Sequence, residues 1–150
     1  MERREALAAY NDAYKEQDDL YRAVARQCGL SDCAFWVLYA LREAGRPMTQ
    51  SDVCAAVYQP KQTVHSALKK LLEEDILRLA EGRDRRSKYL MLTETGEALM
   101  ARTVDRVMAA EETAMDTLTA AERAQFLALC LRYNAALRQS LSTAIEEKKE

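Results

Sequence analysis

The most cationic stretch of the chain is RDRRSK, residues 83–88, in a sequence whose formal net charge is −2. Its cations are Arg83, Arg85, Arg86 and Lys88. Side chains gathered in this way can bind the phosphates of a nucleic acid, and a guanidinium can also enter a minor groove. A solvated charged loop is the competing interpretation. Residues 59–90 carry 8 Lys and Arg against 5 Asp and Glu, whereas the segments on both sides are acidic.

A second group of polar side chains lies just before this stretch, in PKQTVHSALKKLLEE, residues 60–74. At 100° per residue this segment forms a helix whose apolar face holds Val64, Ala67, Leu68, Leu71 and Leu72. The opposite face holds Gln62, His65, Ser66 and Lys69, with Lys61 near the N-terminal end. Gln pairs with adenine edges in a major groove, and Lys reaches guanine or phosphate. Amphipathicity alone leaves an ordinary solvated face as the alternative.

The neighbouring elements can position both groups. Thr49 and Asp52 have the spacing of a capping box that begins a short helix in TQSDVCAAVY, and Pro60 suits the first turn of the next one. Two short helices joined by about three residues predict a helix-turn-helix. ILRLAE, residues 76–81, and KYLMLT, residues 88–93, each fit a strand, with GRDRRS at the tip of their hairpin. We therefore predict a winged helix whose wing carries the cations.

Helices are expected on both sides of this unit, because the chain has only 4 Gly and 2 Pro. A first helix, about 4–28, carries an apolar stripe with three tyrosines. A second helix begins after Ser31, which can cap it, and ends at Gly45. The second helix is apolar on most sides, so Phe35 and Trp36 are expected in the core, with the wall of a ligand pocket as the alternative. The stripe of the first helix holds Leu7, Tyr10, Tyr14, Tyr21, Val24 and Cys28.

Two more helices are predicted in the last third of the chain. Thr93 is a cap for a fifth helix, which carries Met100, Val104, Val107 and Met108. Thr119 and Glu122 form a capping box for a sixth. Its stripe is Phe126, Cys130, Tyr133, Leu137, Leu141 and Ile145. A stripe this long needs a partner, either within the monomer or in a two-fold dimer.

Other classes of protein are disfavoured. Four widely spaced cysteines without a CxxC pair predict neither a disulfide framework nor a zinc site. One histidine, no Gly-rich phosphate loop and no nucleophile motif argue against an enzyme, so we expect no catalytic residues, metal or cofactor. The chain has no apolar run of the roughly 20 residues needed to cross a bilayer and no signal-peptide core. A soluble cytoplasmic protein without a membrane partner is expected.

Residues 48–99 resemble the winged helix-turn-helix core of the MarR family of transcriptional regulators. DRRSKYLMLTETG is the most specific piece, because it matches the pattern of Asp-Arg-Arg, a short strand, Leu-Thr, two residues and Gly. GLSDCAFWVLYAL resembles the second helix of the family, so the likeness spans nearly the whole chain. Two positions depart from the pattern. Asp75 stands where a glycine usually ends the recognition helix, and His65 stands where a serine is common.

The resemblance implies a mainly α fold with a small β-hairpin wing, formed by one MarR-like domain over residues 1–150. Residues 1–28 and 116–150 would be dimerisation helices, 31–92 the winged helix-turn-helix, and 93–115 a connecting helix. A homodimeric repressor that binds a palindromic operator in double-stranded DNA is expected. A winged helix that senses a ligand or binds proteins without binding DNA is the alternative.

The family pattern also assigns roles to residues. Thr63 joins the DNA-binding set, and Asp84 would pair with Arg86 to hold the wing. Family members often release DNA when a small aromatic compound binds between the dimer body and the winged helix, or when a cysteine is oxidised. Trp36 and Tyr39, with the tyrosine stripe, are the candidate lining of such a site, although they serve equally well as core.

Overall fold

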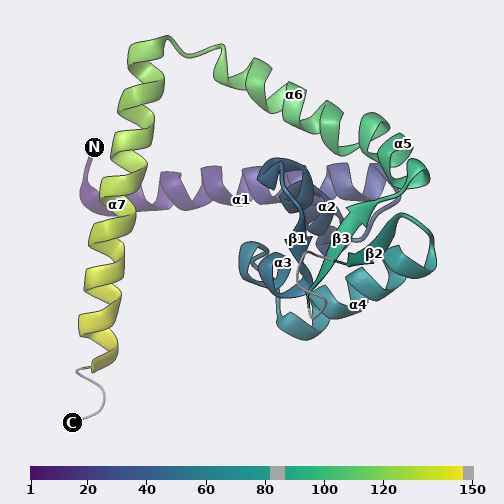
Figure 1. The fold of residues 1–150 in the computed structure, drawn as a ribbon. Coiled ribbons are helices and arrows are strands. Elements are labelled where there is room, and N and C mark those ends of the chain that lie inside the picture. Colours follow the sequence, from purple (N-terminus) through teal and green to yellow (C-terminus); the bar gives the residue numbers. More distant parts are fainter. Residues whose placement is uncertain (82–86, 147–150) are drawn as a thin grey trace. The chain divides into compact units, whose positions relative to one another are not determined.

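The computed structural model describes residues 1–81 and 87–146, which form two compact units, Met1–Arg106 and Val107–Glu150. Figure 1 shows the elements of the first unit gathered around α2 and a small sheet, while the N-terminal half of α1 extends away from them. They are α1 (Arg3–Gln27), α2 (Asp32–Ala44), β1 (Met48–Thr49), α3 (Gln50–Ala56), α4 (Lys61–Glu73), β2 (Leu77–Glu81), β3 (Lys88–Leu92) and α5 (Glu94–Arg102). This arrangement confirms the predicted fold class of helices with a β-hairpin.

The sheet is antiparallel, with the strand order β1-β3-β2. β2 and β3 form the predicted hairpin, in which Leu79 lies opposite Leu90 and Glu81 opposite Lys88. β1 adds a third strand that the sequence analysis did not predict, with Met48 opposite Leu90. Two residues are too few to show the alternation by which a strand is recognised. The tip of the hairpin, with Arg83, Asp84, Arg85 and Arg86, lies outside the described residues.

The core of the first unit lies between α2 and α4. Phe35 and Leu38 of α2 have almost no exposed surface, and neither have Leu68 and Leu71 of α4. Val53 of α3 is equally buried. Burying a side chain of this size contributes roughly 1.5–3 kcal/mol of folding free energy, so a few such contacts fix how α4 packs.

The predicted signals for the ends of the helices are confirmed. Thr49 Oγ1 accepts a hydrogen bond from the Asp52 N–H (3.1 Å), and the Asp52 carboxylate accepts one from the Thr49 N–H (2.8 Å). Ser31 caps α2 through the Ala34 N–H, and Gly45 ends α2 in the left-handed region with φ 58°. Pro60 is the N-cap of α4, one position before the first turn in which it was predicted.

The C-terminus of α4 ends in a Schellman motif. Asp75 has φ 55°, so the residue found in place of the usual glycine takes the left-handed conformation. Its N–H donates to the Leu72 carbonyl and the Ile76 N–H to the Leu71 carbonyl. Thr93, the N-cap of α5, donates from its N–H to the Ile76 carbonyl (3.1 Å). The end of α4 is therefore fastened to the start of α5.

Residues 93–115 form two helices where one connecting helix was predicted. α5 ends at Arg102, and α6 (Val104–Met115) begins after Thr103, whose φ of −126° and ψ of −92° are not helical. The Thr103 side chain is buried, and its hydroxyl donates to the Leu99 carbonyl (2.6 Å). A threonine hydroxyl that bonds to the preceding turn is compatible with a bend in the helix, but Ser66 forms the same kind of bond within the continuous helix α4, so this bond alone does not explain the break.

The second unit contains most of α6 together with α7 (Ala120–Glu146). Thr119 and Glu122 form the predicted capping box, with the Thr119 N–H donating to the Glu122 carboxylate (2.8 Å). Many large apolar side chains of α7 are exposed. They include Phe126, Leu127, Leu129, Leu131, Tyr133, Leu137, Leu141 and Ile145.

The close approach of α5 to the end of α4 makes Gly96 sensitive to substitution. A Cβ there would overlap the Ile76 carbonyl oxygen, whereas a Cβ at Gly45 meets nothing within 4 Å. We expect Gly96→Ala to lower the free energy of unfolding by about 3 kcal/mol, the upper end for overpacking, because a backbone atom cannot move aside as a side chain does. Gly45→Ala, strained only in its φ, should cost roughly 1 kcal/mol. Urea denaturation of both variants tests this, and equal losses would contradict it.

Candidate nucleic-acid interface and aromatic pocket

All six residues of α4 that belong to the predicted DNA-binding set are exposed. They are Lys61, Gln62, Thr63, His65, Ser66 and Lys69. Four of them, Lys61, Gln62, His65 and Ser66, line a shallow hollow of about 500 Å³ in the protein surface. The opposite face is buried at Val64, Ala67, Leu68 and Leu71. The structure therefore brings the predicted residues of this helix together on one accessible surface, which we call the α4 face.

The polar atoms of the α4 face are largely uncommitted. Within the described part of the chain, the side chains of Lys61 and Gln62 form no hydrogen bond or ion pair. Ser66 Oγ donates to the Gln62 carbonyl (3.0 Å), which leaves its lone pairs as acceptors. Lys69 Nζ lies 3.7 Å from Glu73 Oε1, and both side chains are well exposed. Such a solvated pair contributes little stability, so Lys69 is available to another anion.

The hairpin contributes the remaining predicted residues. Lys88 is exposed at the first position of β3, opposite Glu81. Only this one of the predicted wing cations lies in the described residues. Arg83, Asp84, Arg85 and Arg86 are the residues between the two strands and fall outside that range. The paired strands fix where the wing begins and ends, but the roles of its four central residues stay predictions.

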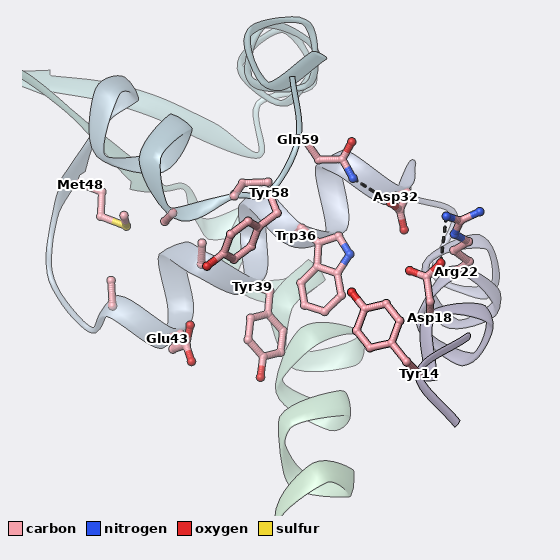
Figure 2. A pocket seen from close by; sticks show the side chains of 14 residues that line it. Tyr14, Asp18, Arg22, Asp32, Trp36, Tyr39, Glu43, Met48, Tyr58 and Gln59 are labelled. Carbon is pink, nitrogen blue, oxygen red and sulfur yellow. Dashed lines mark hydrogen bonds and ion pairs between the residues drawn. The ribbon is translucent and has the colours of Figure 1, made fainter. Parts of the chain in front are cut away.

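A second feature is a cavity of about 490 Å³ beside α2, which we call the aromatic pocket. Figure 2 shows the rings of Tyr14, Trp36, Tyr39 and Tyr58 around it. Trp36 packs against Tyr39 with ring centroids 5.3 Å apart. It is only half-buried, so it does not belong to the closed core in which it was expected, whereas Phe35 does. Trp36 and Tyr39 both line this cavity, and their role in binding a ligand stays a prediction.

The pocket also has charged walls. Arg22 and Asp18 of α1 form an ion pair of 2.9 Å, and the Gln59 side-chain amide donates to Asp32 (3.3 Å), as the dashed lines in Figure 2 mark. Asp32 stands in the first turn of α2, where the helix dipole favours a carboxylate. Glu43, near the other end of α2, has no hydrogen bond or ion pair to any residue that the structure describes.

The sequence analysis found only part of this pocket. Tyr58, Gln59, Asp32 and Glu43 were not singled out, because they follow no shared periodicity and come from different elements. Tyr58 and Gln59 lie in the turn between α3 and α4, and Tyr58 is fully exposed. An aromatic residue in a helix-turn-helix turn was the one available signal, since a solvated turn rarely needs a large ring.

Arg42 connects the pocket helix to the elements that follow the sheet. Its Nε donates to Asp105 Oδ1 (2.7 Å) and its Nη2 to Glu97 Oε2 (2.8 Å). These hydrogen bonds, first that with Glu97, raise the pKa of the Arg42 guanidinium, and burial opposes the shift. Arg42 neighbours Glu43 of the pocket wall. The C-terminal end of α2 is thus tied to α5 and to the first turn of α6.

The cysteines are all free thiols. Cys33 is buried in α2, and burial raises the pKa of its thiol, as do the nearby Asp32 and Cys54. The thiolate is the reactive form of cysteine, so these surroundings make Cys33 less reactive. Cys28, Cys54 and Cys130 are half-buried.

Among the described residues, no group of His, Cys, Asp and Glu side chains is arranged to hold a metal ion. Likewise, none of the described helices combines the length and the apolar character needed to span a bilayer.

Comparison with known proteins adds independent information. Residues 29–87 match a sequence model of the MarR family. The transcriptional repressor NicR of Pseudomonas putida is 28% identical over 118 residues, which cover 78% of this chain and 74% of NicR. A MarR family regulator from Neisseria meningitidis has a similar structure, with a TM-score of 0.72 and 25% identity over 95% of this chain and 98% of that one.

A further solved structure is that of Bordetella bronchiseptica BpsR, whose DNA binding is regulated by 6-hydroxynicotinic acid. The matched region covers 85% of this chain and 91% of the BpsR chain, with a TM-score of 0.61 and 24% identity. The segment matched by the family model, residues 29–87, runs from α2 through the helix-turn-helix to the hairpin. Residues 29–87 are thus similar in sequence to the MarR family of transcriptional regulators, and the fold of the chain is similar to that of MarR family regulators of known structure.

Proposed function

We propose that the protein is a homodimeric, sequence-specific DNA-binding repressor whose affinity for its operator is controlled by a small aromatic molecule. The α4 face is the observation that carries this proposal. It presents hydrogen-bonding and cationic side chains on a helix whose other face is fixed in the core. The name of the relative NicR, a transcriptional repressor, supports repression in preference to activation.

In this proposal the residues divide by the part of DNA that they contact. Gln62, His65 and Ser66 read base edges in the major groove, with Thr63 beside them. Lys61 and Lys69 bind phosphates or guanine, and they orient the helix. Lys88 and the arginines Arg83, Arg85 and Arg86 form a wing that reaches the minor groove, with Asp84 holding the wing in shape.

A second copy of the chain is the proposed partner of α7. Leu131 and Ile145 are each about three-fifths exposed, and Phe126 is half exposed. Contiguous apolar surface of this kind marks an interaction site in a soluble protein, and two-fold dimers are the commonest assembly. Two copies would also present two α4 faces, which matches a palindromic operator.

The aromatic pocket is the proposed effector site. Its lining includes Val57, Tyr58 and Gln59, the residues that lead directly into α4. A ligand between these residues and Trp36 would bias the position of the turn, and with it the α4 face. BpsR, whose DNA binding responds to a small aromatic acid, supports this kind of control.

Base contacts and phosphate contacts can be separated on the α4 face. Gln62→Ala should lose roughly 1–3 kcal/mol of preference at one base position and keep the salt dependence of binding. Lys61→Ala should weaken binding to all sequences alike and reduce the slope of log affinity against log salt by about 1. The measurement is fluorescence anisotropy over a salt series, with a DNA fragment selected from a random pool by the unaltered protein and its scrambled counterpart.

Lys15→Ala, which removes an exposed lysine of α1, is the control for loss of charge. It should leave both affinity and slope unchanged. If Gln62→Ala and Lys61→Ala also bind as the unaltered protein does, the α4 face does not contact DNA. A winged helix that senses a ligand or binds proteins without DNA would then be the better description, in keeping with the net charge of −2.

The dimer proposal is tested on α7. Sedimentation at micromolar concentration should give twice the 17.0 kDa mass of the chain. Leu137→Glu should raise the dimer dissociation constant by at least about a hundredfold, because each interface would bury two unpaired charges while helix propensity is kept. Gln139→Glu, an exposed position off the stripe, should leave the dimer intact. A monomeric unaltered protein would refute the proposal.

If an effector, and not cysteine oxidation, controls DNA binding, an oxidant should have no effect on the affinity for DNA. Mild peroxide should leave Cys33 as a thiol in mass spectra and DNA affinity unchanged, because the raised pKa of Cys33 keeps the nucleophilic thiolate scarce at neutral pH. A reversible loss of affinity that Cys28→Ser or Cys33→Ser abolishes would instead identify a redox switch.

A further inference from the structure

We propose that the aromatic pocket selects a cationic aromatic effector, such as a quaternary ammonium or protonated amine on an aromatic frame, over an aromatic carboxylate. The inference rests on the proposed function, in which this pocket is the effector site. It adds the charge of the ligand, which neither the family nor the relatives decide for this chain.

The first argument is the charge of the lining. Asp18, Asp32 and Glu43 bring three carboxylates to the pocket, and Arg22 is the one Lys or Arg among the described residues that line it. Arg22 is paired with Asp18 at 2.9 Å, so these two charges compensate each other. Asp32 and Glu43 remain. The neutral amide of Gln59 hydrogen-bonds to Asp32 but does not cancel its charge.

The second argument is the nature of the walls. Figure 2 shows Trp36 between Tyr14 and Tyr39, with Tyr58 facing them from the turn before α4. The face of an aromatic ring is electrostatically negative, so rings around a cavity attract a cation, most strongly a poorly hydrated one. The rings and the carboxylates of the pocket therefore both favour a positively charged ligand. An organic cation fits both, and its aromatic frame can stack on Trp36.

The third argument concerns what an anionic ligand would require. Its carboxylate would need the guanidinium of Arg22, which Asp18 already holds. Displacing Asp18 would leave a further unpaired carboxylate in a lining that already contains Asp32. The side chains of Arg22 and Asp18 are about half exposed, so water weakens this penalty without reversing its sign.

Three phenols that differ in the charge of their para substituent test the proposal. (4-Hydroxyphenyl)trimethylammonium is the cation, 4-tert-butylphenol is its neutral isostere, and 4-hydroxybenzoate is the anion. Trp36 is the only tryptophan in the sequence, so its fluorescence reports a ligand in this pocket. We expect the cation to bind about tenfold more tightly than the neutral isostere, as cation–π attraction in a partly desolvated site predicts. The anion should bind more weakly than both.

Variants separate charge from shape. Glu43→Gln and Asp32→Asn should each lower the affinity for the cation about threefold to tenfold, because each removes one unpaired negative charge from the wall. Both should leave the affinity for 4-tert-butylphenol unchanged. Glu16→Gln removes a charge from α1 outside the pocket lining, and it should leave all three affinities unchanged. Thermal unfolding checks that the Asp32 variant keeps its fold.

The outcomes distinguish this proposal from the proposed function. Equal affinity for cation and isostere, or tightest binding of the anion, would overturn the charge selectivity while keeping the pocket as an effector site. If no probe changes the fluorescence of Trp36, the cationic effector is refuted, and DNA binding by the α4 face stands on its own salt-series result. Cation binding that lowers DNA affinity, and that needs a threefold to tenfold higher cation concentration in Glu43→Gln, would support both.

Discussion

The packing of α4 against α2 is the contact on which the proposed DNA surface depends. Phe35 and Leu38 meet a face of α4 whose Val64 and Leu68 have essentially no exposed surface. Because the side-chain period of a helix is fixed, burial of this face orients the opposite one toward solvent. An α4 rotated by one residue, about 100°, so that Lys69 took the buried position of Leu68 would expose Leu71, at a cost far above any gain in contact. The hydrophobic core thus sets which side chains can reach DNA.

The C-terminal end of α4 is also held, which restricts how the helix can move. At its C-terminus the left-handed Asp75 and the Thr93 cap hold the chain, although an aspartate stands where glycine is usual. Aspartate tolerates this conformation better than most residues, so the departure from the family pattern does not change the helix stop. At its N-terminus α4 is reached through the turn of Val57 and Tyr58. Any adjustment of α4 by a ligand must pass through that turn or through α2.

Signals carried by neighbouring residues allowed most of the fold to be predicted. The capping box of Thr49 and Asp52, the Ser31 cap and the period of α4 are local, and each indicates its element without knowledge of the rest. The break at Thr103 could not be predicted, because no Gly or Pro marks it in the sequence. β1 exists only because Met48 lies beside Leu90. The α4 face was predictable because one helix carries it, whereas the pocket collects Tyr14, Trp36 and Tyr58 from separate elements.

A single helix, α2, belongs to both proposed sites. Phe35 faces the core beneath α4, while the next residue, Trp36, faces the pocket, and Arg42 continues to α5 and α6. A ligand can change DNA affinity only by its difference in affinity between two arrangements of the protein. The wall formed by Tyr58 and Gln59 is the part of the pocket that precedes α4, so contacts to these two residues would provide that difference. Contacts that are the same in both arrangements would strengthen ligand binding without affecting DNA binding.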